Sequence, residues 1–189
     1  MFKKIIKVFS FFALIQVLAY SCCDESFNVY YDSVEFIATD RNETLNTTIA
    51  SQDLVLNVSF LYNYIQISEI IKWDEFSNSV YATSCNEDYF FKDSITSINI
   101  ISNEAVLNID AGSSLNDKLI FINPKNLENQ SINDLVNFLN NENSVYGYER
   151  LDIRFNEMLT SNLVLDFSIQ IELQGDRVLE STTNLITIE

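Results

Sequence analysis

The side chains that could do chemistry in this 189-residue chain are mainly carboxylates: there are 27 Asp and Glu, three Cys and no His. Without His, the chain lacks the commonest general base, the commonest metal ligand and the usual partner of a Ser or Cys nucleophile. Two carboxylates about 5 to 10 Å apart can still hydrolyse a glycosidic bond, and carboxylate oxygens can bind calcium. The sequence singles out no such pair and has no Asp-rich calcium loop. We therefore predict no catalytic residues, no metal site and no cofactor.

The charge balance argues against nucleic acid as a partner. The formal net charge is −16 at pH 7, and no cluster of Lys or Arg follows residue 7. A surface this acidic repels phosphate backbones instead of releasing their counterions. We expect no binding to nucleic acid.

Residues 1–21 have the pattern of a signal peptide. Lys3, Lys4 and Lys7 come before an uncharged apolar run from Val8 to Tyr20. That run is too short to span a bilayer core of about 30 Å as a helix, which favours a cleaved export signal. The alternative is a buried helix at the start of a cytosolic domain.

The apolar run ends in Leu18-Ala19-Tyr20-Ser21-Cys22-Cys23, which resembles a lipobox, the site where a bacterial lipoprotein receives a diacylglycerol thioether. Cys22 is favoured over Cys23 as the lipidation site because Ser21 and Ala19 place small residues at positions −1 and −3. Several acyl chains, at about 0.8 kcal/mol per buried methylene, would make the anchor effectively permanent. An unlipidated secretory signal is the alternative.

Residues 22–25 are expected to form a lipidated tether. Asp24 and Glu25 resemble the surface-export signal of Bacteroidota lipoproteins, and a merely solvated tether stays equally open. An oxidising periplasm would allow a disulfide between Cys23 and Cys85, which would close a loop of about 60 residues and contribute about 4 kcal/mol. A free, buried Cys85 is the favoured alternative.

Alternation of apolar and polar residues with period two predicts strands throughout the rest of the chain. The expected strands are 29–38, 54–60, 79–83, 95–101, 119–123, 151–155, 163–173 and 177–188. The last two form a hairpin around Gly175. The segment 62–73 is apolar without a clean period and is open between strand and helix.

One short helix is predicted near 131–141. Ser131 and Asp134 have the spacing of a capping box, and apolar residues recur at helical spacing from Ile132 to Leu139. Many strands with a single helix favour an all-β fold, an immunoglobulin-like two-sheet β-sandwich over residues 26–189. The helix is expected to cover an open end or edge of that sandwich.

Four segments carry a resemblance to a known family: Cys22-Cys23-Asp24-Glu25, Ile95-Thr96-Ser97-Ile98, Ala111-Gly112-Ser113-Ser114-Leu115-Asn116-Asp117 and the closing hairpin from Phe167 to Ile186. In these segments the chain resembles an uncharacterised family of Bacteroidota lipoproteins. The resemblance implies a fold and a compartment, the cell envelope, with a lipid anchor in the outer membrane and the domain facing the periplasm or the surface. It implies no activity.

Two short segments also resemble the O-glycosylation motif of Bacteroidota. They are Asp32-Ser33-Val34 and Asp93-Ser94-Ile95, in which Ser33 and Ser94 would be modified. A eukaryotic secreted glycoprotein would instead carry glycans on its Asn-x-Ser/Thr sequons. These sequons begin at Asn42, Asn46, Asn57 and Asn129.

The function expected from the sequence is that of a lipid-anchored envelope protein, not an enzyme, that binds or supports a protein or glycan partner. Tyr146 and Tyr148, which alternate around Gly147 in an expected loop, are the aromatic residues singled out for glycan contact. The alternative is an envelope hydrolase that cleaves glycans with paired carboxylates.

Overall fold

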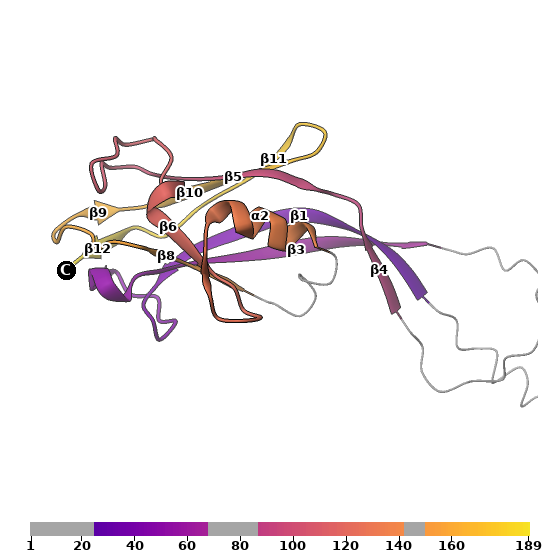
Figure 1. Cartoon of the computed structure of the whole chain (residues 1–189), viewed down its shortest axis with the longest axis horizontal. Coiled ribbons are helices and arrows are strands. Elements are labelled where there is room, and N and C mark those ends of the chain that lie inside the picture. The colour runs from indigo at the N-terminus through magenta and orange to yellow at the C-terminus, as the bar shows by residue number, and fades with distance from the viewer. Residues whose placement is uncertain (1–24, 68–86, 142–149) are drawn as a thin grey trace, which may run out of the picture. The chain divides into compact units, whose positions relative to one another are not determined.

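The computed structural model describes residues 25–67, 87–141 and 150–189 and is mostly β (Figure 1). Contacts divide the chain into two compact units: Met1–Val29 with Tyr64–Phe90, and Tyr30–Asn63 with Phe91–Glu189. The predicted strand at 79–83 lies outside the described residues. The predicted division into residues 1–21, 22–25 and 26–189 stays a prediction.

The largest sheet has six strands in the order β4-β1-β3-β8-β6-β7. Its strands are β1 (Glu25–Thr39), β3 (Val55–Ile67), β4 (Glu87–Phe91), β6 (Leu119–Ile122), β7 (Asn129–Gln130) and β8 (Leu151–Phe155). Four of these were predicted, and β3 runs on to Ile67, so the described part of the ambiguous segment is strand.

Two further sheets have three strands each. The first, in the order β11-β10-β5, is antiparallel and consists of β5 (Ile95–Ser102), β10 (Phe167–Leu173) and β11 (Arg177–Thr182). The second, in the order β2-β12-β9, consists of β2 (Thr48–Ile49), β9 (Val164–Leu165) and β12 (Ile186–Ile188). The 3-10 helices η1 (Ser51–Asp53) and η2 (Asn116–Lys118) lie in connections. In Figure 1, β5, β10 and β11 form the upper layer of the body and β8 lies beneath them.

The closing hairpin differs from the prediction in one respect, because each of its two long strands is divided between two sheets. The expected strand 163–173 breaks at Asp166, and the expected strand 177–188 breaks after β11. The Asp166 N–H donates to Asn103 Oδ1 (3.0 Å), and the Asn103 N–H donates to the Asp166 carbonyl (3.2 Å). Asn103 therefore replaces the neighbouring strands as the partner of Asp166, and the chain passes from one sheet to the other at this point.

The predicted helix is confirmed as α2 (Ile132–Asn140). Its capping box is complete, since Ser131 Oγ accepts from the Asp134 N–H (3.2 Å) and Asp134 Oδ2 accepts from the Ser131 N–H (3.1 Å). The buried helix side chains are Ile132, Leu135, Phe138 and Leu139. They pack on β5 and β6, which belong to different sheets, so α2 links the two layers.

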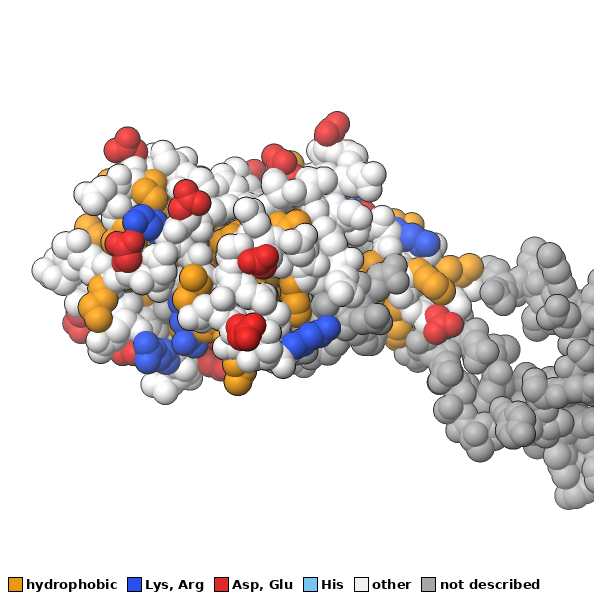
Figure 2. All heavy atoms as spheres, viewed as in Figure 1, with side chains coloured by type: hydrophobic (Ala, Val, Ile, Leu, Met, Phe, Trp, Pro, Cys, Tyr) orange, Lys and Arg blue, Asp and Glu red, His pale blue; other side chains and the backbone are white. Residues whose placement is uncertain are grey.

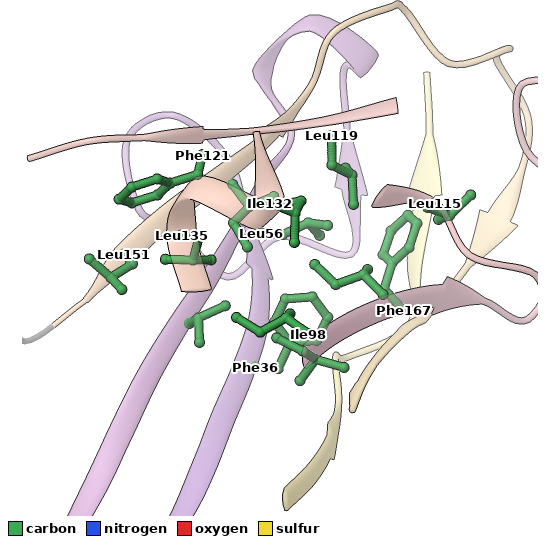
Figure 3. Close-up of a cluster of buried hydrophobic side chains, with 14 of the residues drawn as sticks. Phe36, Leu56, Ile98, Leu115, Leu119, Phe121, Ile132, Leu135, Leu151 and Phe167 are labelled. Carbon is green, nitrogen blue, oxygen red and sulfur yellow. The ribbon is translucent and has the colours of Figure 1, made fainter. Parts of the chain in front are cut away.

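The hydrophobic core lies between the layers and under the helix (Figure 3). The rings of Phe155 from β8 and Phe167 from β10 lie 5.6 Å apart, and those of Phe121 from β6 and Phe138 from α2 lie 5.3 Å apart. Aromatic pairs at such distances add to the stabilisation that burial alone provides. The inward residues are those that alternation predicts.

Tyr31 of β1 connects the core to the end of the helix. Its hydroxyl donates to the Leu139 carbonyl (3.4 Å), and its ring lies 5.1 Å from Phe60 and 6.1 Å from Phe91. Burial, and to a smaller extent the negative charge of Asp93, raises the pKa of Tyr31. The side chain is therefore neutral at physiological pH.

Side-chain amides cover the outer edge of β5. Asn140 accepts from the Ile95 N–H and donates to the Ile95 carbonyl, both at 2.8 Å. Asn116 accepts from the Ile100 N–H (3.1 Å) and donates to the Ile98 carbonyl (2.7 Å). These amides satisfy backbone groups that a bare edge would offer to another strand.

The described part of the smaller unit comprises short stretches of β1, β3 and β4. The rings of Phe27 and Tyr89 are stacked with centroids 5.4 Å apart, and Tyr64 meets Tyr89 edge-on at 5.9 Å. Aromatic contacts hold these strand ends together.

Candidate functional site

The residues predicted for lipidation, a disulfide and glycan contact all lie outside the described residues. These are Cys22, Cys23, Cys85, Tyr146 and Tyr148. Their roles stay predictions.

The two predicted O-glycosylation sites lie in different settings. Ser33 is half-buried within β1, whereas Ser94 is exposed in the connection between β4 and β5. Asp93 beside Ser94 is already engaged, because its Oδ2 accepts from the Tyr31 N–H (2.8 Å) and from the Arg177 guanidinium (2.7 Å). Access therefore favours Ser94 over Ser33 as a modification site.

One of the four Asn-x-Ser/Thr sequons is inaccessible in the folded chain. Asn57 lies in β3 with 3 % of its surface exposed, and its amide donates to Thr39 Oγ1 (2.6 Å). A glycan on Asn57 would have to be attached before folding and would prevent this packing.

No group of three or more Cys, Asp or Glu among the described residues is arranged to hold a metal ion. Likewise, none of the helices within residues 25–67, 87–141 and 150–189 is long and apolar enough to span a membrane.

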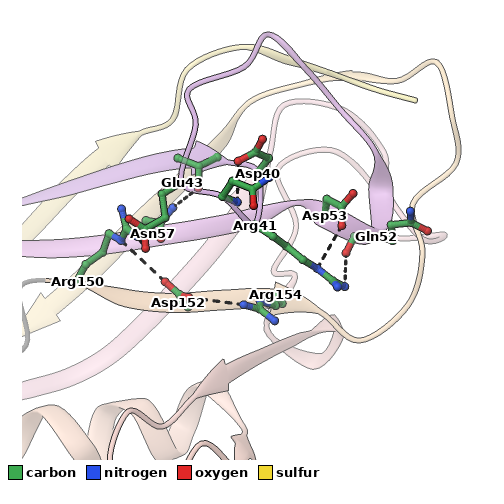
Figure 4. Close-up of polar contacts among 11 residues, drawn as sticks. Asp40, Arg41, Glu43, Gln52, Asp53, Asn57, Arg150, Asp152 and Arg154 are labelled. Carbon is green, nitrogen blue, oxygen red and sulfur yellow. Dashed lines mark hydrogen bonds and ion pairs between the residues drawn. The ribbon is translucent and has the colours of Figure 1, made fainter.

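A cluster of polar side chains lies on the outer face of the six-stranded sheet (Figure 4). Strand alternation places them there: Leu151 and Ile153 of β8 point into the core, so Arg150, Asp152 and Arg154 point outward. Across the strands, Asn57 is in register with Asp152, and Ile120 is in register with Arg154.

Three of the chain's four arginines lie on this face, although the chain as a whole is strongly acidic. Arg150 pairs with Glu43, and Asp152 lies within 4.0 Å of Arg150 Nε and within 3.7 Å of an Arg154 amino group. Arg41 follows β1 and donates to the Gln52 carbonyl (2.7 Å). Each of these pairs is at least one-third exposed, so solvent screening limits its contribution to stability.

Arg41 also lies close to an acidic partner, because its Nε is 3.3 Å from Asp53 Oδ1. Arg154, by contrast, makes no hydrogen bond within the described part of the chain, and its Nε is buried without a partner. Asn57 Oδ1 on the same face is also buried without a partner. An unsatisfied buried donor or acceptor costs about 1–3 kcal/mol, so both atoms lower the stability of this face.

Three adjoining depressions follow β6, the first two on this outer face and the third beside η2 and the start of α2, and we call them together the outer trough. The first, of about 550 Å³, is lined by Glu43, Ile122, Pro124, Leu127, Arg150, Leu151 and Asp152. The middle one, of about 290 Å³, shares Ile122 with the first and includes Arg41 and Arg154 in its lining. The third, of about 360 Å³, shares Ile120, Asn129 and Asn156 with the middle one. Figure 2 shows basic, acidic and apolar side chains interspersed along the lower edge of the body.

Two residues on the rim of the first depression have strained backbones. Glu43 and Leu127 have φ angles of 63° and 59°, and Leu127 is 77 % exposed. A left-handed conformation costs a non-glycine residue about 1–2 kcal/mol. Such strain gathers at functional sites more often than elsewhere, and it holds an apolar side chain at the edge of the trough.

A second surface is apolar and belongs to the strand ends of the smaller unit. Tyr64, Ile65 and Ile67 of β3 and Phe90 of β4 are each more than one-third exposed. Its side chains are apolar apart from the Tyr64 hydroxyl.

Sequence reasoning did not find the outer trough. A signal was present, because Arg150, Asp152 and Arg154 alternate with the buried residues of β8. What the sequence did not reveal is that β6, β7 and the loop carrying Arg41 lie beside this face, since those contacts span distant parts of the chain.

Comparison of the chain with protein-family models, with curated proteins and with solved structures finds no match in any of the three.

Proposed function

We propose that this chain is a lipid-anchored binding module of the cell envelope, attached through Cys22, that recognises a glycan in the outer trough. The observation that carries the binding proposal is the trough itself, with polar and apolar side chains side by side and arginines that are scarce elsewhere in the chain. Sugars present both hydroxyls and apolar C–H faces, so sites for them combine hydrogen-bonding groups with apolar surface. The anchor rests on the signal-peptide pattern and the lipobox resemblance.

The fold part of the proposal is that the body is a variant of the immunoglobulin-like sandwich. Support comes from two layers that share one core, with α2 packed on strands of both. Pairing is antiparallel among β3, β8, β6 and β7 in one layer and among β5, β10 and β11 in the other. The small sheet of β2, β9 and β12 would then close one end, because β9 and β12 continue the strands of the upper layer.

The hydrolase alternative has weaker support. Glu43 and Asp152 are the carboxylates that line the first depression, and both lie in ion pairs with Arg150. Glycoside hydrolysis needs two carboxyl groups that face the scissile bond in different roles, whereas both of these carboxylates contact the same guanidinium.

The anchor can be tested by intact-protein mass spectrometry on the full chain expressed in a Bacteroidota host. We expect a mature species that begins at Cys22 and carries acyl mass, lost in Cys22→Ala and retained in Cys23→Ala. An unacylated species in the unmodified chain would overturn the anchor.

The binding proposal can be tested on immobilised neutral and acidic oligosaccharides. Asn129 is exposed and lines two of the depressions, so Asn129→Trp should fill the trough and weaken binding about tenfold or more. Ser113→Trp, on an exposed loop outside the trough, should leave binding unchanged. The absence of binding to every oligosaccharide, or an equal loss in both variants, would count against the trough.

A further inference from the structure

We infer that the middle depression of the outer trough binds the carboxylate of an acidic saccharide, with Arg154 as the carboxylate-binding residue. This inference rests on the proposed glycan-binding function and specifies its ligand.

Two of the three arginines are already engaged. Arg41 is bound to the Gln52 carbonyl and to Asp53, and Arg150 is bound to Glu43. These contacts hold both side chains in place in the lining of the outer trough. They leave the guanidinium of Arg154 as the group with donors to spare.

Arg154 is held in place without being satisfied. Its one ionic contact with a described residue is to Asp152, at 3.7 Å, which is too long for a hydrogen bond. Its Nε is buried without an acceptor, while its side chain keeps 35 % of its surface exposed. A ligand that enters the depression can therefore reach the exposed amino groups of the guanidinium, although not the buried Nε.

The geometry of a guanidinium selects the ligand's charged group. Its planar fork presents two parallel N–H donors, which match the two oxygens of a carboxylate. Arg41 lines the same depression and adds positive charge. Glu157 also lines this depression and pairs with Lys118 (2.6 Å), and Asp53 and Asp152 lie beside the two arginines. The N–H donors of Arg154, and not a locally positive surface, therefore select the carboxylate.

The rest of the lining suits a sugar ring. Gln52, Asn129 and Asn156 bring side-chain amides, which can donate to or accept from hydroxyls. Ile120 and Met158 bring apolar surface for the C–H face of a ring, and Met158 is 72 % exposed. A volume of about 290 Å³ lies at the lower end for small-molecule sites, which are about 300–1,000 Å³, so we expect one sugar unit to occupy it.

The test uses a matched pair of ligands and the purified full chain in detergent. The ligands are tetragalacturonate and its full methyl ester, which has the same rings without the charges, and binding is measured by isothermal titration calorimetry. We expect the acid to bind at least about tenfold more tightly than the ester, the range for hydrogen bonds to a charged group.

Three variants locate the effect. Arg154→Gln should weaken binding of the acid about tenfold or more and leave binding of the ester unchanged, and Arg154→Lys should fall between the two. Lys92→Gln is the control, because it removes one positive charge from an exposed residue that lines none of the three depressions. Circular dichroism would verify that each variant is folded.

The other outcomes overturn the inference in distinguishable ways. Equal binding of acid and ester would exclude a carboxylate site and leave the glycan-binding function standing. Equal weakening by Lys92→Gln would mean a general charge effect. Competition by acetate or by a tetraglutamate peptide at the same carboxylate concentration would exclude saccharide selectivity. The absence of binding to either galacturonate and to the whole neutral panel would overturn the proposed function as well.

Discussion

Asn57 shows how far the environment of a single residue can depart from what its type suggests. It lies near the start of β3 with polar neighbours on the outer face, yet it is almost fully buried, and so is its hydrogen-bond partner Thr39. Burial of this amide lowers the stability of the folded state, because its oxygen loses hydrogen bonds to water on folding and gains no protein donor. The pair therefore restrains β1 against β3 at a cost to the free energy of folding.

We expect the loss of one partner of this hydrogen bond to destabilise the fold more than the loss of both partners. Thr39→Val removes the acceptor that the Asn57 amide has among the described residues. It should destabilise the fold by about 1–3 kcal/mol, since a buried amide then loses its hydrogen bond. The double variant Thr39→Val/Asn57→Leu removes both polar groups and should recover most of that loss. Urea unfolding followed by fluorescence measures both, and a double variant no more stable than the single one would contradict the argument.

At the scale of an element, α2 depends on its amino-terminal cap. The hydrogen bonds from the Ser131 side chain and backbone lower the pKa of Asp134 below its ordinary value of 3.8. A carboxyl group whose pKa is lower in the folded state stabilises that state when it is ionised. The contribution is complete above the unfolded-state pKa and is lost as the pH falls through the lowered, folded-state pKa.

Two substitutions test the cap. Ser131→Ala should destabilise the fold by about 1 kcal/mol at neutral pH, the usual cost of losing an N-cap. Asp134→Asn should be less stable than the unmodified chain at pH 6, and the difference should shrink as the pH falls below about 4. Urea midpoints measured across that range give the difference directly. A gap that stays constant with pH would exclude the ionised carboxylate as its source.

At the scale of the whole molecule, polar contacts tie the two layers at places where no strand pairing does so. Arg177, at the start of β11, donates to the Tyr31 carbonyl of β1 and to Asp93. Asn184 continues this connection, because its Oδ1 accepts from the Ala38 N–H (3.1 Å) further along β1. Arg177 and Asn184 thus link the upper layer to β1, while α2 links it to β6.

Loss of the Arg177 contacts should lower the free energy of unfolding. The Asp93 side chain is 15 % exposed, so Arg177→Ala leaves a mostly buried carboxylate without its charged partner. Because Arg177 itself is 47 % exposed, screening limits the expected cost to about 1–2 kcal/mol. A double-mutant cycle with Asp93→Asn should give a coupling energy above about 0.5 kcal/mol. Strictly additive effects of the two substitutions would show that the pair does not hold the layers.

The sequence by itself determined most of the long strands and the helix: alternation located β1, β3, β5, β6, β8, β10 and β11, and the Ser131 to Asp134 spacing located α2. It did not predict β2, β4 or β7. These signals are local, because side-chain period and capping depend on neighbours a few residues away. Only the tertiary structure decided the break at Asp166, the burial of Asn57 and the gathering of three arginines around β6. Each of these depends on contacts between residues far apart in the chain, such as Asn103 with Asp166 or Glu43 with Arg150. No local period encodes such contacts, so the candidate site became visible when the sheets were assembled.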